Sequence, residues 1–217
     1  MTLSMTVRPI IQHELACAAQ IHCLAFPDSA LTKLGTEAVR RYYHWLLSGP
    51  HDSVCLGAFN GSDMLGFCFG GIFRGALSGY VRANRLFLAR RVVTRPWMLA
   101  NPIFRERLEL GMRVLRWNRK PKPAVSPAPS AEPRARSFGI LSIAVHPERQ
   151  GSGVGRLLMA ESERIALARG FRQMNLSVHP TNTQAIRFYE GLGWERVTQD
   201  GVWTGQMKKQ IGEGALQ

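Results

Sequence analysis

The chain has 217 residues, of which 45% are hydrophobic, and a chain of this length can bury one sizeable core. No stretch is long and apolar enough to span a bilayer, and the residues before His13 lack a hydrophobic signal segment, so we expect a cytoplasmic protein. The four cysteines show neither metal-ligand nor redox-motif spacing, so we predict reduced thiols and no metal site. The formal net charge is +13, and residues 82–122 contribute most of it, with 12 basic residues against Glu106 and Glu109.

The first third of the chain predicts a strand, two helices and two more strands. A strand is expected over residues 6–10, and a helix follows from Ile11 to Phe26, where Pro27 ends it. A loop over residues 28–35 leads to a second helix from Thr36 to Ser48. Alternating and apolar runs then predict strands over residues 54–59 and 64–72, joined by a turn at residues 60–63.

A basic helical insertion is predicted next, over residues 78–120. Residues 82–99 favour a helix that breaks at Pro96, and Asn101-Pro102 is typical of the start of another helix. Repeated prolines with Ser and Ala between them indicate a flexible linker over residues 121–135. We therefore expect a single domain over residues 1–217 that contains this insertion and linker.

A glycine turn between a strand and a helix is the most informative feature of the chain. The apolar run 140–145 precedes Gln150-Gly151-Ser152-Gly153-Val154-Gly155, and an amphipathic helix pattern follows. Glycines permit backbone angles that let successive N–H groups converge, and a helix start adds unpaired donors and a positive dipole end. The sequence therefore predicts a site for a phosphate or pyrophosphate.

Two common phosphate-binding motifs do not fit. A Walker loop needs Gly-Lys-Ser/Thr, whereas Gly155 is followed by Arg156 and Leu157. A dinucleotide-binding unit needs an acid at the end of its second strand, and here the strand over residues 174–178 ends in His179-Pro180.

The segment instead resembles the GCN5-related N-acetyltransferase (GNAT) family. The chain reads Val145-His146-Pro147-Glu148-Arg149-Gln150 before the glycines, which matches the family pattern of a Val-x-Pro strand end and Gln/Arg-x-x-Gly-x-Gly/Ala. A second family block follows as residues 182–189 and Gly191-Leu192-Gly193-Trp194. The resemblance covers residues 138–209.

The resemblance implies a mixed α/β sheet, the acyl-CoA N-acyltransferase fold, with the helical insertion between the third and fourth strands. It implies acetyl-CoA as acyl donor, whose pyrophosphate the glycine turn would bind, while the preceding strand offers backbone groups to the pantetheine arm. The residues expected to bind the coenzyme are Ile143, Ala144, Val145, Gln150, Gly151, Ser152, Gly153, Val154, Gly155, Arg156 and Asn182. Tyr189 matches the family tyrosine that protonates the leaving thiolate, a task that suits a phenol with a pKa near 10.

The general base has several candidates. Some relatives carry a glutamate two residues before the position of His179, where this chain has Ser177. His179 is the preferred base, and His146, His22 or a water relayed to a carboxylate are the alternatives. His22 lies on an apolar helix face, where a satisfied core histidine is the competing interpretation.

The amine acceptor is predicted to bind at the loop between the first two helices, through Phe26, Asp28 and Ser29. Phe26-Pro27 and residues 31–35 loosely resemble acetyltransferases that accompany bacterial surface-polysaccharide synthesis, which implies an amino-sugar acceptor. The alternatives are a protein N-acetyltransferase acting on ribosomal or N-terminal amines, and a catalytically silent acyl-CoA-binding module.

The basic insertion has three possible roles. Lys and Arg with aromatics suit a nucleic-acid surface, but the large aliphatic faces make nucleic acid the least favoured partner. A basic segment with Leu, Phe and Trp suits peripheral contact with the inner membrane through residues 82–122. A helical hairpin packed on the domain, with solvated arginines, is the third possibility.

Overall fold

The computed structural model describes residues 5–94 and 137–212, and the chain divides into two compact units. The first unit combines residues 1–11, 50–73 and 135–217. The second unit combines residues 12–49 and 74–134.

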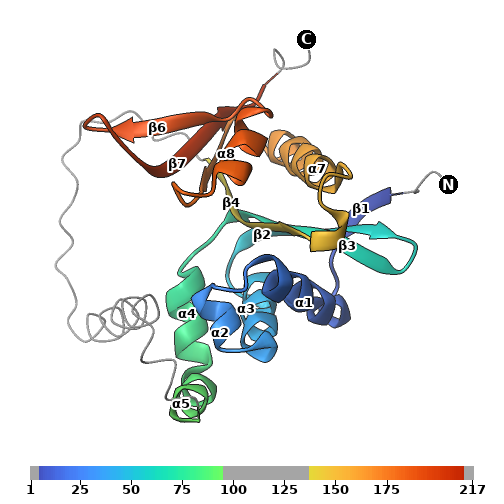
Figure 1. Cartoon of the computed structure of the whole chain (residues 1–217), viewed down its shortest axis with the longest axis vertical. Helices are drawn as coiled ribbons and strands as arrows, with labels where there is room; N and C mark the ends of the chain where they lie inside the picture. The colour runs from blue at the N-terminus through green and yellow to red at the C-terminus, as the bar shows by residue number, and fades with distance from the viewer. Residues whose placement is uncertain (1–4, 95–136, 213–217) are drawn as a thin grey trace. The chain divides into compact units, whose positions relative to one another are not determined.

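The first unit is built on a seven-stranded sheet (Figure 1). Its strands are β1 (Met5–Pro9), β2 (Asp52–Asn60), β3 (Asp63–Ile72), β4 (Phe138–Val145), β5 (Gln173–Ser177), β6 (Glu195–Gln199) and β7 (Val202–Gln210). The order across the sheet is β1-β2-β3-β4-β5-β7-β6. Within this sheet β4 and β5 run parallel and the other neighbours run antiparallel, so the predicted mixed α/β sheet is confirmed.

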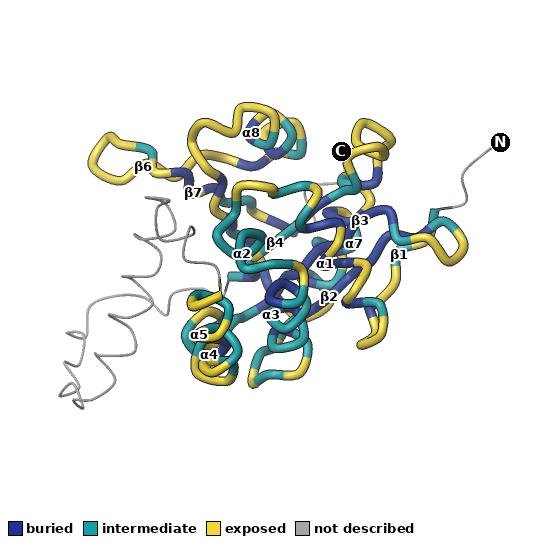
Figure 2. Tube along the Cα trace, turned by 60° about the horizontal axis from the view of Figure 1, so that its bottom comes forward, coloured by how far each residue is buried: buried dark blue, intermediate teal, exposed yellow. Residues whose placement is uncertain are grey.

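Helix α7 (Val154–Ala168) packs across β1–β4, and the shorter α8 (Thr183–Glu190) belongs to the same unit. The buried face of α7 repeats at helical spacing, with Val154, Leu158, Met159, Ser162 and Ala166 turned inward. Strands β2 and β3 carry unbroken runs of buried residues, which Figure 2 shows in dark blue. Full burial of one Leu, Met or Phe side chain stabilises the fold by about 1.5–3 kcal/mol, so this core holds β4 and α7, which flank the glycine turn, in place.

The second unit is helical. Its elements are the 3₁₀ turn η1 (Gln12–Glu14) and helices α1 (Leu15–Ala25), α2 (Ala30–Lys33), α3 (Thr36–Ser48), α4 (Ala76–Ala83) and α5 (Arg85–Val93). Helix α3 packs against both α1 and α4. A Cβ atom at Gly79 would lie 2.3 Å from the indole ring of Trp45, so only glycine permits this approach of α4 to α3. The buried Tyr80 hydroxyl then donates to the Ala38 carbonyl at 3.0 Å.

Most element predictions are confirmed within a few residues, and two are wrong in detail. The loop expected over residues 28–35 contains α2, because the Ser29 side chain accepts a hydrogen bond from the Thr32 amide and caps a short helix. Of the helix expected over residues 82–99, α5 covers 85–93, whereas residues 82–83 instead end α4, and Asn84 divides the two helices. The predicted break at Pro96, the helix start at Asn101-Pro102 and the linker at 121–135 lie outside the described residues.

No helix within residues 5–94 and 137–212 has the length and apolar character needed to cross a membrane.

Candidate active site

The glycine turn lies between β4 and α7, with a 3₁₀ turn, η3 (Pro147–Arg149), leading into it. Gly151 and Gly153 adopt φ angles of 77° and 87°, which are left-handed values that side chains with a Cβ disfavour. A Cβ atom built at either residue would meet no atom within 4 Å. The two glycines are therefore required by the backbone conformation, and the space beside them is open to a ligand.

The start of α7 supplies hydrogen-bond donors next to this turn. Gly153 is the N-cap residue and has no side chain with which to cap, and the Leu157 amide makes the first bond of the helix, to the Gly153 carbonyl. The amides of residues 154–156 consequently have no partner within the helix. Together with the positive end of the helix dipole, they suit a pyrophosphate.

Gly155 has a different role from the two turn glycines. A Cβ atom at this position would lie 3.2 Å from the ring of Phe188 on α8. Its lack of a side chain therefore lets the start of α7 approach α8, the helix that carries Tyr189.

Strands β4 and β5 pair over only part of their length. Phe138–Ile140 of β4 faces Met174–Leu176 of β5, and no register pair between these strands follows. On its other edge β4 stays paired with β3. A bulge interrupts this pairing, because Leu141 of β4 lies between Ile140 and Ser142, which pair with Gly70 and Phe69. The edge of residues 143–145 that faces away from β3 is thus unpaired within the described sheet, as backbone contacts to a pantetheine arm would require.

Asn182 caps α8, because its side-chain oxygen accepts a hydrogen bond from the Ala185 amide at 3.1 Å. In the last turn of the same helix, Tyr189 is buried, with its ring centroid 5.9 Å from that of Trp194. Burial, with a smaller contribution from the nearby Cys68, raises the pKa of the Tyr189 hydroxyl. The phenol therefore carries its proton at neutral pH, and burial makes it a weaker acid than an exposed tyrosine.

The candidate bases differ in exposure. His179 is exposed just beyond β5, and its Nδ1 lies 2.8 Å from the hydroxyl of Thr181 and accepts from the Thr181 amide at 3.4 Å. His146 precedes η3, and its Nδ1 accepts from the Glu148 amide. His22 belongs to the second unit and is only 8% exposed, and burial lowers its pKa to about 4. Of these three, His179 remains the best placed to exchange protons with a ligand or solvent.

The predicted acceptor residues Phe26, Asp28 and Ser29 also belong to the second unit, whereas the glycine turn and Tyr189 belong to the first. Asp28 is strongly exposed and forms an ion pair with Lys33 at 2.9 Å. Ser29 caps α2, and Phe26 meets His22 edge to face at 5.0 Å between ring centroids. Each of these side chains thus has a local structural role, and acceptor binding stays a prediction.

The structure also contains a cavity that the sequence did not predict. Arg41, Arg82, Ala83, Asn84, Arg85, Leu86 and Phe87 line a cavity of about 570 Å³ in the second unit. The high charge of the insertion was the available signal, but Arg41 lies far from it in sequence.

The glycine turn and the N-terminus of α7 thus belong to the same unit as a parallel strand pair whose pairing ends at Ile140 and Leu176. Residues 112–194 match the family model described as Acetyltransferase (GNAT) family. Over these residues the chain is similar to the GNAT acetyltransferases.

Named acetyltransferases also match part of the chain. Mycothiol acetyltransferase of Thermobispora bispora is 41% identical over 61 residues, which cover 28% of this chain and 21% of that protein. The chain thus spans about a fifth of the length of the mycothiol acetyltransferases it matches.

Two solved structures share the fold over nearly the whole chain. The PaiA N-acetyltransferase of Thermoplasma acidophilum, in complex with coenzyme A, aligns with a TM-score of 0.57 at 15% identity, over 96% of this chain and 99% of that one. YncA of Salmonella typhimurium, solved with its cofactor acetyl-CoA, aligns with a TM-score of 0.53 at 18% identity, over 98% and 96%. At these identities the likeness concerns the fold alone.

Proposed function

We propose that this protein transfers the acetyl group of acetyl-CoA directly to a primary amine. The observation that carries the proposal is the glycine turn, with Gly151 and Gly153 in left-handed conformations at the start of α7. The amides of residues 151–156 would hold the pyrophosphate, with Gln150 leading into the turn. The backbone of Ile143–Val145 would hold the pantetheine arm, and Asn182 would contact the coenzyme beside its capping role.

The reaction needs a neutral amine, a positioned thioester and an acid for the leaving group. The amine nitrogen attacks the thioester carbonyl, a C–N bond forms, and the C–S bond breaks. His179 takes the proton that the amine loses, and the Tyr189 hydroxyl protonates the departing thiolate. The products are an acetamide and the free thiol of coenzyme A, and no acyl group is attached to the enzyme.

The acceptor in this proposal binds near Phe26, Asp28 and Ser29, and an amino sugar of a polysaccharide precursor is the first class to test. Its support is the sequence resemblance of Phe26-Pro27 and residues 31–35. Ribosomal or N-terminal amines are the alternative acceptors. A silent acyl-CoA-binding module is the alternative without catalysis, since neither strand beside the site supplies a carboxylate.

Release of free thiol from acetyl-CoA, measured across a panel of amino sugars, peptides with free N-termini and simple amines, tests the function. We expect amine-dependent release, with an equal amount of acetylated product detected by mass spectrometry. Binding of acetyl-CoA without release for any amine would contradict transfer and support the silent module.

We also propose that α4 and α5 contact anionic membranes. Leu86, Val93 and Leu77 are 80%, 78% and 52% exposed, beside the exposed Arg82, Arg85 and Arg90. Apolar side chains among cations suit the interface of an anionic bilayer. Peripheral binding at the inner membrane would bring the enzyme to acceptors made there.

A further inference from the structure

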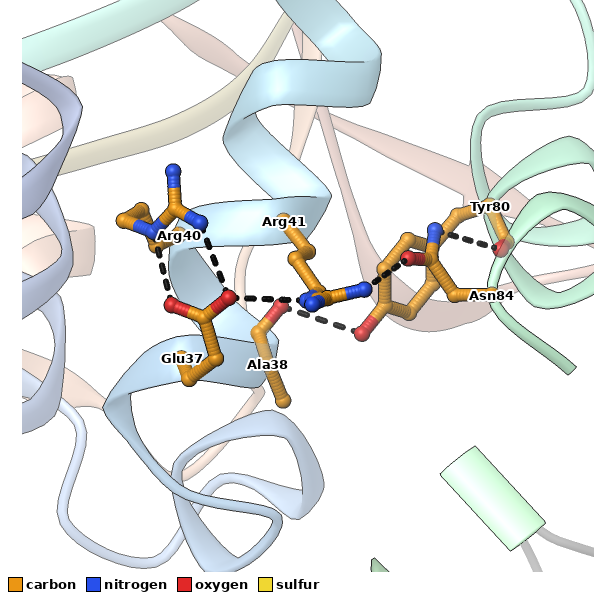
Figure 3. Close-up of polar contacts among 6 residues, drawn as sticks. All are labelled: Glu37, Ala38, Arg40, Arg41, Tyr80 and Asn84. Carbon is orange, nitrogen blue, oxygen red and sulfur yellow. Dashed lines mark hydrogen bonds and ion pairs between the residues drawn. The ribbon is translucent and has the colours of Figure 1, made fainter. Parts of the chain in front are cut away.

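A second basic feature of the molecule lies where α4 meets α5. Asn84 ends α4 and precedes α5, and its backbone amide donates to the Tyr80 carbonyl at 3.0 Å. Its side-chain nitrogen donates to the same carbonyl at 3.1 Å, and its side-chain oxygen accepts from an Arg41 Nη at 3.4 Å (Figure 3). The side-chain nitrogen and oxygen of Asn84 are thus both engaged, the nitrogen with the end of α4 and the oxygen with Arg41 of α3.

Arg41 is also fixed from its other sides. Its Nε donates to Glu37 at 2.8 Å, and its guanidinium carbon lies 4.2 Å from the ring centroid of Phe87. Three contacts from α3, α5 and Asn84 therefore hold one guanidinium in place before any ligand arrives.

The charge of this guanidinium is only partly balanced. Glu37 accepts two hydrogen bonds from Arg40, at 2.7 and 2.8 Å, in addition to the one from Arg41 (Figure 3). These bonds, those from Arg40 foremost, lower the pKa of Glu37 to about 2, so a single negative charge serves two arginines at neutral pH.

Two further arginines face the same space. Arg82 and Arg85 are exposed and line the cavity of about 570 Å³ together with Arg41, Asn84 and Phe87. Neither forms an ion pair with any described residue, and residues 74–94 contain no Asp or Glu. The cavity thus gathers three guanidinium groups with one shared, already occupied carboxylate nearby.

We infer that this cavity binds the phosphate group of a phosphorylated ligand. Guanidinium groups match phosphate oxygens with paired, charge-assisted hydrogen bonds, and three of them exceed what one carboxylate ligand would need. The volume is within the range of small-molecule sites and larger than an inorganic phosphate, so it leaves room for a ligand with atoms beyond the phosphate group. The chemistry is shared by soluble phosphate esters and by lipid phosphate headgroups. This site is separate in sequence and unit from the glycine turn that binds pyrophosphate in the proposed function.

The test is a titration of the full-length protein with inorganic phosphate, followed by NMR signals of the arginine Nε–H groups and of the glycine amides. We expect the Arg82 and Arg85 signals to shift with a common, saturable affinity. Shifts of the Gly151 and Gly153 amides report on the glycine turn separately, so neither site obscures the other.

Two variants of α5 form a matched pair for this titration. Arg85→Gln removes a cavity arginine, and Arg90→Gln removes an exposed arginine of the same helix that does not line the cavity. We expect Arg85→Gln to weaken phosphate affinity by about tenfold, the usual worth of a charge-assisted hydrogen bond, and Arg90→Gln to leave it within about twofold. An equal loss in both variants, or no saturable shift at Arg82 and Arg85, would overturn the inference, since solvated arginines would explain either result.

Vesicle flotation of Arg85→Gln and Arg90→Gln distinguishes a lipid headgroup from a soluble phosphate ester as the ligand. The vesicles contain phosphatidic acid or phosphatidylcholine. A lipid headgroup ligand predicts that Arg85→Gln binds phosphatidic acid vesicles more weakly than Arg90→Gln does. A soluble phosphate ester predicts equal flotation of the two variants, while their difference in phosphate affinity persists.

Discussion

The Nδ1 atom of His22 lies 2.6 Å from the hydroxyl oxygen of Tyr43, and its Nε2 lies 3.3 Å from the Ser29 hydroxyl. Both ring nitrogens of this buried histidine are therefore engaged inside the second unit, and Tyr43 is itself fully buried. The arrangement favours a neutral histidine that joins α1 to α3 and to the start of α2 over a catalytic base.

This relationship predicts a pH dependence of stability. The pKa of His22 is about 4 in the folded protein and 6.5 in the unfolded chain, so the unfolded state binds the extra proton between these values. Its contribution is complete above pH 6.5 and is lost as the pH falls toward 4. Between pH 7.5 and pH 5 we expect the parent to lose about 2 kcal/mol of unfolding free energy through this group.

Urea unfolding of the parent and of His22→Gln at both pH values checks this prediction. The variant should be less stable at pH 7.5 and should show a smaller loss on acidification. Glu37 does not interfere, because its stabilising ionisation is lost only below its unfolded pKa of 4.5. Parallel pH profiles for the two proteins would show that His22 does not titrate in this way.

Gly153→Val should abolish the binding of acetyl-CoA at the glycine turn. The new side chain enters the open space that the phosphates need, and the left-handed backbone is strained by about 1–2 kcal/mol. Gly170→Val is the matched control, because Gly170 also has a positive φ of 79° and open space, but lies beyond the far end of α7. Acetyl-CoA should raise the melting temperature of the parent and the control, and not of Gly153→Val. If all three respond alike, the turn does not hold the coenzyme.

Tyr189→Phe should lower the turnover number by about 10²–10⁴-fold, the usual worth of general-acid catalysis. The affinity for acetyl-CoA should hardly change, because a ring of the same shape stays packed against Trp194. Steady-state thiol release and calorimetric binding measure the two quantities separately. Full turnover in the variant would leave Tyr189 with a packing role only.

Gly79→Ala should destabilise the second unit by about 1–3 kcal/mol, the usual cost of overpacking. The added methyl group would lie 2.3 Å from the Trp45 ring, so α4 must move away from α3. Trp45→Phe removes the part of the ring in question, and the double variant should recover part of the loss in a thermal unfolding cycle. Strict additivity of the two changes would show that the rings and helices adapt without strain.

The membrane proposal predicts flotation with anionic vesicles that high salt weakens without abolishing. Charge alone is worth about 1 kcal/mol per basic residue near the surface, and apolar burial adds a part that salt does not screen. Leu86→Gln/Val93→Gln should remove the salt-resistant part, because these residues lie seven apart on one face of α5. Deletion of residues 82–122 should end binding. A parent protein that stays soluble at low salt would contradict the proposal.

The glycine turn could be predicted from sequence because its chemistry is local. Left-handed backbone angles at residues 151 and 153 depend on the missing Cβ atoms, and the cap of α8 depends on one Asn182 side chain three residues from its partner. The strand and the helix that flank the turn follow from short-range hydrophobic patterns for the same reason. The family resemblance rests on these local features as well.

Contacts between residues distant in the chain were decided only by the tertiary structure. Three features depend on how separate elements pack: the partial pairing of β4 with β5, the contact of the Tyr43 hydroxyl with buried His22, and the cavity that Arg41 and Arg85 line. The division at Asn84 belongs here too, since its side chain is used to hold Arg41 as well as Tyr80. The periodicity of a segment predicts which of its faces is buried. The hydrophobic effect is non-directional, so it does not specify which element packs against that face. Shape and hydrogen-bond geometry in three dimensions select the partner.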